Sequence, residues 1–105
     1  MTTTVVLSSL SLEYVRVAVT IKRLGVEVDP TTDTVQMAFT AVGVEPVSAD
    51  WKSASWETVD GEYIARCLVG PTGTVTLSDN MYTIWVKVAD DPEIPVRPVG
   101  RLRVS

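Results

Sequence analysis

The sequence predicts a single all-β domain, an antiparallel sandwich or barrel of seven or eight short strands. First, 19 Val, 13 Thr and 4 Ile make about a third of the 105 residues β-branched, and branched side chains favour pleated sheets over helices. Second, several segments alternate apolar and polar residues with a period of two. Third, turn residues recur at close intervals, and no helical periodicity extends beyond two turns. The length suits one domain.

The first half of the chain predicts three strands after an N-terminal segment. The first strand covers residues 13–22, and its core face carries Val15, Val17, Val19 and Ile21. Gly25 then permits a turn, and residues 26–28 form a short strand. Pro30 ends that strand, because proline has no N–H to donate to a neighbour. Residues 34–41 alternate without interruption and predict the third strand.

The second half predicts five more strands. They are expected at residues 51–58, 63–69, 74–77, 82–89 and 100–104. Trp56 is expected to face the core, whereas the sequence leaves open whether Trp51 is buried or exposed. Asp60 and Gly61 form a strong turn dipeptide between two of the strands. Residues 90–98 are expected to be extended and irregular, because three prolines remove backbone donors there.

Two similar tetrads each open a strand with a tyrosine. They end in Tyr63 and Tyr82, and we expect both to be tight turns that place a tyrosine at a strand start. The first is typical of the tyrosine corner of immunoglobulin-like sandwiches. In antibody domains a cysteine follows the tyrosine by two positions, whereas Cys67 lies four positions after Tyr63 and has no partner cysteine. The sequence therefore predicts no disulfide.

The composition argues against nucleic-acid binding and against catalysis. The net charge of −4 disfavours a nucleic-acid partner, which requires a cationic surface. With no histidine, no Ser-x-x-Lys and no Gly-x-Ser-x-Gly, the chain lacks the usual nucleophile and base pairs, so we expect no enzyme and no cofactor. Cys67 lies in an apolar strand pattern and is expected to be a buried hydrophobic residue.

The ends and hydropathy of the chain predict neither export nor membrane insertion. The N-terminus has no Lys or Arg before Arg16, and Thr and Ser interrupt its apolar residues, so we expect no signal peptide. No apolar run approaches the roughly 20 residues that a membrane helix requires. We expect synthesis in a reducing cytoplasm.

The densest acidic group consists of Asp90, Asp91 and Glu93. Catalytic carboxylate pairs usually face each other across a cleft, whereas these residues share one proline-rich loop. Oxygen ligands close in sequence suit calcium, but the spacing is not that of an EF-hand loop. We therefore expect no metal site, although the sequence leaves a bound ion open.

Some strands are apolar on both faces. Beyond their core-facing positions, residues 63–69 carry Ile64 and Leu68, and residues 82–89 carry Trp85. Such strands need cover on both sides, either from a crossover within the monomer or from another chain. These three side chains are therefore interface candidates.

The chain is divided into residues 1–12, an N-terminal arm or edge strand, and residues 13–105, the sandwich domain. The further interface candidates of the arm are Thr4, Val5, Val6 and Leu7, since an uncharged β-prone segment can add to the sheet edge of a neighbour. On this hypothesis, deleting residues 2–8 leaves a folded domain that assembles poorly.

Several segments resemble small β-sandwich virion structural proteins of tailed phages that infect actinobacteria. They are Asp29-Pro30-Thr31, Val35-Gln36-Met37-Ala38-Phe39, Trp56-Glu57-Thr58, Gly61-Glu62-Tyr63-Ile64-Ala65-Arg66-Cys67-Leu68-Val69 and Gly100-Arg101-Leu102-Arg103-Val104. The chain is similar, more loosely, to the immunoglobulin-like N-terminal domains of phage baseplate proteins. The resemblance implies a sandwich of the immunoglobulin-like type and a particle component present in many copies.

Two functions follow as hypotheses. The first is a non-enzymatic virion subunit of the head or head-tail (neck) region, a capsid decoration or connector protein. Its partners would be capsid, portal, connector or tail subunits and copies of itself, bound through strand edges and an apolar face. The alternative is a carbohydrate- or receptor-binding module of the tail tip or baseplate, for which the stacking candidates are Tyr14, Trp51 and Trp56.

Overall fold

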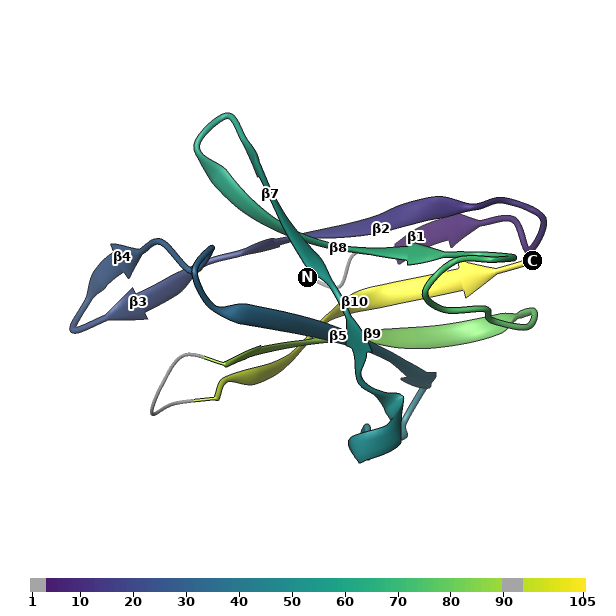
Figure 1. Cartoon of the computed structure of the whole chain (residues 1–105). Helices are drawn as coiled ribbons and strands as arrows, with labels where there is room; N and C mark the ends of the chain where they lie inside the picture. Colours follow the sequence, from purple (N-terminus) through teal and green to yellow (C-terminus); the bar gives the residue numbers. More distant parts are fainter. Residues whose placement is uncertain (1–3, 90–93) are drawn as a thin grey trace.

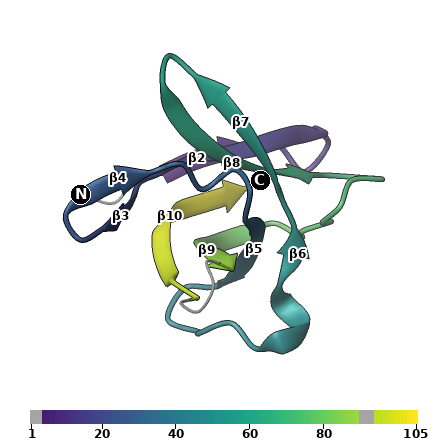
Figure 2. The same cartoon turned by 60° about the vertical axis from the view of Figure 1, so that its left-hand side comes forward.

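Ten strands and one short 3-10 helix make up the part of the chain that the computed structural model describes, residues 4–89 and 94–105. The five-stranded sheet contains, in spatial order, β1 (Thr4–Leu7), β10 (Val96–Val104), β9 (Asn80–Ala89), β5 (Thr34–Ala41) and β6 (Lys52–Ser53). The three-stranded sheet contains β2 (Glu13–Val19), β8 (Glu62–Val69) and β7 (Ser55–Val59). A hairpin of β3 (Ile21–Arg23) and β4 (Val26–Val28) projects beyond both sheets (Figure 1 and Figure 2).

This arrangement confirms the predicted antiparallel β-sandwich. Between the named strands of the described residues, the pairings are antiparallel except for β1, which runs parallel to β10. The order β2-β8-β7 corresponds to strands B, E and D of an immunoglobulin-like sandwich, and β10-β9-β5 corresponds to G, F and C. In the same scheme β6 lies at position C′, beside β5. The single cysteine is free, so the sandwich holds together without a disulfide.

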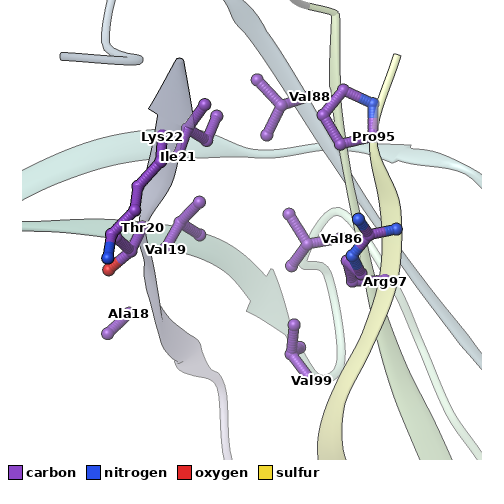
Figure 3. Close-up of a pocket in the computed structure, with 10 residues that line it drawn as sticks. All are labelled: Ala18, Val19, Thr20, Ile21, Lys22, Val86, Val88, Pro95, Arg97 and Val99. Carbon is purple, nitrogen blue, oxygen red and sulfur yellow. The ribbon is translucent and has the colours of Figure 1, made fainter. Parts of the chain in front are cut away.

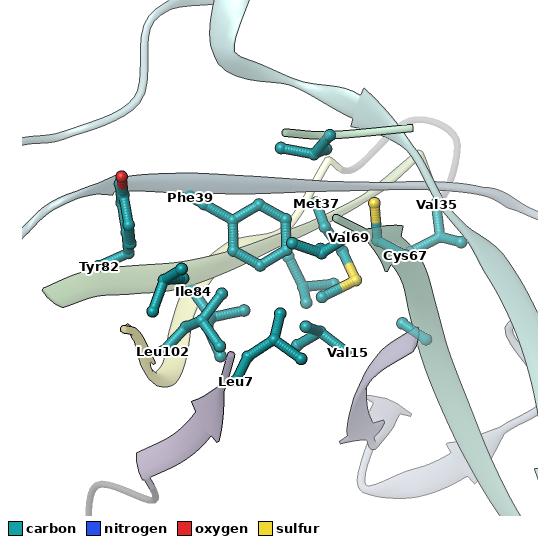
Figure 4. Close-up of a cluster of buried hydrophobic side chains, with 14 of the residues drawn as sticks. Leu7, Val15, Val35, Met37, Phe39, Cys67, Val69, Tyr82, Ile84 and Leu102 are labelled. Atoms are coloured by element: carbon teal, nitrogen blue, oxygen red, sulfur yellow. The ribbon is translucent and has the colours of Figure 1, made fainter. Parts of the chain in front are cut away.

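The core lies between the inner faces of the two sheets. Alternate residues of each strand point into it, as the period-two pattern predicts. Its fully buried large side chains include Met37, Ile84, Leu102 and Val15, which come from both sheets and interlock in Figure 4. Burying such side chains supplies most of the free energy of folding.

Residues 51–58 do not form one strand. Lys52 and Ser53 pair with β5, whereas residues 55–59 pair with β8 in the other sheet. At the crossing point, the Ala54 N–H donates to the Val35 carbonyl over 3.2 Å. The chain therefore changes sheets within this segment, and Trp51 precedes the strand.

Three other strand boundaries differ from the prediction. The segment 13–22 breaks at Thr20 into β2 and β3. Residues 74–77 cross between the sheets and contribute only an isolated bridge between Val75 and Val69. The last strand begins at Val96 rather than Gly100, because a register shift lets Pro98 lie within it.

The tyrosine corner is formed by Tyr82, not by Tyr63 as the sequence predicted. The Tyr82 hydroxyl donates to the Ser78 carbonyl over 2.8 Å, across the connection from β8 to β9. The two tetrads also differ in their turns. Asp60 and Gly61 have φ values of 50° and 79°, typical of a two-residue hairpin turn, whereas Asn80 is already the first residue of β9.

Candidate interaction surfaces

Strand β1 belongs to the sandwich itself. It pairs in parallel with residues 101–104 of β10, and Leu7 is only 4% exposed in the core. Val5 is half-buried, whereas Thr4 and Val6 are exposed. The segment is thus an edge strand of its own sheet, and Leu7 is inaccessible to a partner while β1 stays in place. Removal of residues 2–8 would open the core, contrary to the expectation of an intact domain.

The outer face of the three-stranded sheet brings together candidates that the sequence assigned to two different hypotheses. Tyr14 lies directly opposite Leu68, and Ile64 lies opposite Ala18 on the same face. The Arg66 guanidinium carbon is 4.4 Å from the centre of the Tyr14 ring, a cation-π contact. This face therefore offers an aromatic ring beside Leu68, whereas Ile64 lies further along β8, beyond the Arg16–Arg66 pair.

One carboxylate bridges two arginines on that face. Arg16 and Arg66 are directly opposite each other on β2 and β8, and like charges at such positions repel. Glu57 lies between them, with its oxygens 3.0 Å from Arg16 Nε and 3.2 Å from Arg66 Nη1. The network holds both guanidinium groups in fixed orientations beside Tyr14.

Trp85 lies on the outer face of the five-stranded sheet, where the chain covers it in part. Its indole N–H donates to Thr40 Oγ1 over 3.0 Å, and the Thr40 hydroxyl donates to the Val44 carbonyl over 2.6 Å. Ala38, directly opposite Trp85, is fully buried although it faces outward. The loop between β5 and β6 therefore covers part of this face from within the chain.

The three aromatic stacking candidates lie on different surfaces. Trp51 is half-buried on the five-stranded sheet, with the Lys87 ammonium 4.5 Å from its ring centre. Trp56 packs against the core, and its indole N–H donates to the Asp33 carbonyl over 2.9 Å. Tyr14 is on the outer face of the other sheet. These three residues therefore do not form one surface on which a sugar ring could stack.

The β3–β4 hairpin carries a feature that sequence reasoning missed. Leu24 is fully exposed at its tip, with a φ of 53°, and Gly25 follows with a φ of 79°. Val26 beside them is 65% exposed. The sequence does carry a sign of this feature, because Leu24 occupies a turn position immediately before Gly25 where Asn, Asp or Gly is preferred.

A groove opens on the side of the sandwich where β2 and β3 face β10. It has a volume of about 270 Å³ and lies between two rows of mostly aliphatic side chains (Figure 3). Lys22 and Arg97 are the charged residues among those that line it. A second hollow, between Val5, Ala18 and Val99, continues along the same side.

Among the residues that the structure describes, two titratable groups have shifted pKa values, and neither forms a reactive site. Burial raises the pKa of the Cys67 thiol to about 11, and the side chain is 1% exposed, so the nucleophilic thiolate is disfavoured. The Thr31 hydroxyl and backbone N–H donate to Asp29 and lower the pKa of that carboxyl. These bonds fix the turn before β5.

Residues 4–89 and 94–105 contain no group of three or more potential metal ligands. Within the same ranges, no helix is long and apolar enough to cross a membrane. The acidic residues Asp90, Asp91 and Glu93, considered above for calcium, lie outside the described residues.

Comparison with protein-family models, with curated proteins and with solved structures found no match to this chain.

Proposed function

We propose that the chain is a non-catalytic structural subunit of a tailed-phage virion, in the head or neck region, that contacts its neighbours through the tip of the β3–β4 hairpin. The segments quoted above for their resemblance to virion β-sandwich proteins support the setting. The immunoglobulin-like strand order is compatible with a module that works by surface contact. The acidic net charge keeps free subunits soluble before assembly.

Leu24 is the observation that carries this proposal. A leucine in left-handed backbone conformation is strained relative to Gly or Asn, and a fully exposed leucine gains nothing from burial. Both features are unfavourable in the isolated chain. Contact with an apolar pocket on a neighbouring subunit would offset them, because burial there would remove the leucine side chain from water.

The dispersed aromatic side chains weigh against a carbohydrate-binding module. A sugar platform requires exposed rings on one surface, whereas Trp56 packs on the core and the other two rings lie on opposite sheets. We therefore place the contact at the hairpin rather than at Tyr14, Trp51 or Trp56.

The test is the substitution Leu24→Asn. The variant chain is expressed from a plasmid in infected cells, so that it is present while phage particles assemble. Asn tolerates positive φ, so we expect the free energy of unfolding to stay equal or rise by about 0.5 kcal/mol. Incorporation into purified particles, measured by quantitative mass spectrometry against wild type, is expected to fall severalfold.

Leu10→Asn is the matched control, because Leu10 is 89% exposed but lies in the loop between β1 and β2. It should leave incorporation unchanged. Wild-type incorporation of Leu24→Asn would contradict the hairpin contact, and absence of the wild-type chain from particles would contradict the virion assignment.

A further inference from the structure

The groove on the open side of the sandwich is bordered by strand edges rather than by loops. One wall is formed by residues 18–22 of β2, Thr20 and β3. The other wall is formed by β9 and β10, with Val86, Val88 and Val99 pointing toward the first wall (Figure 3). Val86 and Val88 of this second wall are nearly fully buried.

The edge of β10 is only half occupied. Along its whole length β10 pairs with β9, but on its other side β1 pairs only with residues 101–104. Among the described residues, no strand pairs with that side of residues 96–100. Backbone donors and acceptors on a free edge are a template for an added strand.

The line of β1 shows how such a strand would fit. Thr4 lies opposite Arg101, so the path that β1 follows continues along residues 96–100 and over the groove. In β1, Val5 and Leu7 turn toward the inside of the sandwich, and Thr4 and Val6 turn outward. An occupant with the same alternation would place every second side chain above Val86 and Val88.

The same edge disfavours indiscriminate pairing. Pro98 has no N–H, and the register shift between Pro98 and Gly100 interrupts the ladder. Prolines and irregularities of this kind protect free edges from aggregation. Affinity must therefore come largely from the inward side chains and from charge, which makes the edge selective.

The charge of the groove defines the occupant. Lys22 and Arg97 line it, and no carboxylate is among its lining residues in the described part of the chain. Arg16 lines the hollow that continues from it, but its charge is already paired with Glu57. This cationic margin contrasts with the net charge of −4 for the whole chain. The margin favours a segment that carries carboxylates at the ends of an apolar alternating stretch.

We propose that the groove between β2–β3 and β10 binds an extended acidic segment of a partner protein, which adds a strand beside residues 96–100. The inward aliphatic side chains of this segment fill the groove, and its carboxylates pair with Lys22 and Arg97. The inference rests on the groove itself and is independent of the virion assignment.

The test uses the purified full chain and the labelled peptide acetyl-Glu-Val-Thr-Val-Thr-Val-Glu-amide. A control peptide carries Lys in place of both Glu residues. Fluorescence anisotropy should show that the acidic peptide binds at least about tenfold more tightly, because two exposed charge pairs change from attraction to repulsion. Hydrogen exchange should slow at those amides of residues 96–100 that point away from β9, since successive residues of a strand direct their N–H groups to opposite edges.

Two double variants locate the site. Lys22→Glu with Arg97→Glu should weaken binding of the acidic peptide about tenfold, whereas Arg101→Glu with Arg103→Glu should change it little. The control pair reverses two charges on the exposed outer face of the same strand. A fusion of the acidic peptide to the N-terminus through a Gly-Ser linker raises its effective concentration, so weak binding is also detected.

Equal affinity for both peptides, or binding without protection of residues 96–100, would overturn the proposal. The same holds if neither the free peptide nor the fusion slows exchange at those amides. A peptide-free dimer, measured by light scattering, with these amides already protected would assign the groove to a second copy and overturn it as well.

Discussion

At the scale of single residues, Tyr82 fixes the crossover from one sheet to the other. Its ring is buried in the core, and its hydroxyl reaches back to the Ser78 carbonyl. A buried aromatic ring with a satisfied hydroxyl combines apolar burial with a directional bond. The entry of the chain into β9 is thereby held in one geometry.

Tyr82→Phe should lower the free energy of unfolding by about 1 kcal/mol, because the hydrogen bond is lost while the ring remains. Urea titration followed by tryptophan fluorescence measures the change. Tyr63→Phe is the matched control and should change stability by no more than a few tenths of a kcal/mol. Equal effects of the two substitutions would show that the tyrosine corner contributes nothing specific.

The sequence indicated a tyrosine corner but placed it at the wrong tyrosine. Asp60 and Gly61 do form the expected turn, because their residue types encode positive φ locally. A tyrosine corner is different, since it depends on which connection crosses between the sheets. The residues around Tyr63 lie in a hairpin within one sheet, so no crossover is present there to be tied.

At the scale of elements, Gly70 sets the spacing between the end of β8 and the loop before β2. Its φ is 138°, and an added Cβ would overlap the Ser11 carbonyl oxygen and lie 2.8 Å from Leu12 Cα. Backbone fills the space that a side chain would need, so the glycine is required for the close approach.

Gly70→Ala should therefore destabilise the fold by about 3 kcal/mol, since neither backbone segment can move without disturbing its strand. Thermal unfolding monitored by circular dichroism checks this value. Gly43→Ala is the control for positive φ alone, because open space surrounds its Cβ position, and its cost should be about 1 kcal/mol. A cost for Gly70→Ala no greater than that of the control would refute the steric argument.

At this scale the sequence predicts which segments form strands, but it does not predict which strands pair with each other. Residues 34–41 and 82–89 alternate clearly and form β5 and most of β9. Residues 51–58 also read as one strand, but they divide between two sheets at Ala54. The division is set by contacts with distant strands, which the local pattern does not contain.

At the scale of the whole molecule, β1 completes one end of the five-stranded sheet. It supplies Leu7 to the core and covers residues 101–104 of β10. An edge strand of this kind contributes through its one buried side chain as well as through its ladder bonds.

Leu7→Ala should cost about 3 kcal/mol in the free energy of unfolding, through lost apolar burial and the cavity left behind. Val6→Ala should stay within about 0.5 kcal/mol, because Val6 is 68% exposed on the same strand. Chemical denaturation of both variants provides the comparison. Similar values for the two would indicate that β1 is not packed on the core in solution.

The sandwich could be predicted from the sequence, but its surfaces could not. The fold class is predicted from the β-branched composition and the alternation of the whole chain, so an error in one strand boundary does not change it. The groove arises because Val19 of β2 lies near Val86 and Val99 of β9 and β10, which are far from β2 in sequence. The same is true of the meeting of Tyr14 with Leu68.

The passage of one continuous segment through both sheets at Ala54 ties one margin of the sandwich together. Along one margin, covalent chain links β6 in one sheet to β7 in the other. Along the opposite margin, β2 and β10 face each other across the groove. The loop between β1 and β2 crosses between the sheets at this margin too, because β1 pairs with β10. Covalent chain therefore joins the two sheets at both margins, and any change in groove width has to be accommodated by the β1–β2 loop or by bending of the strands.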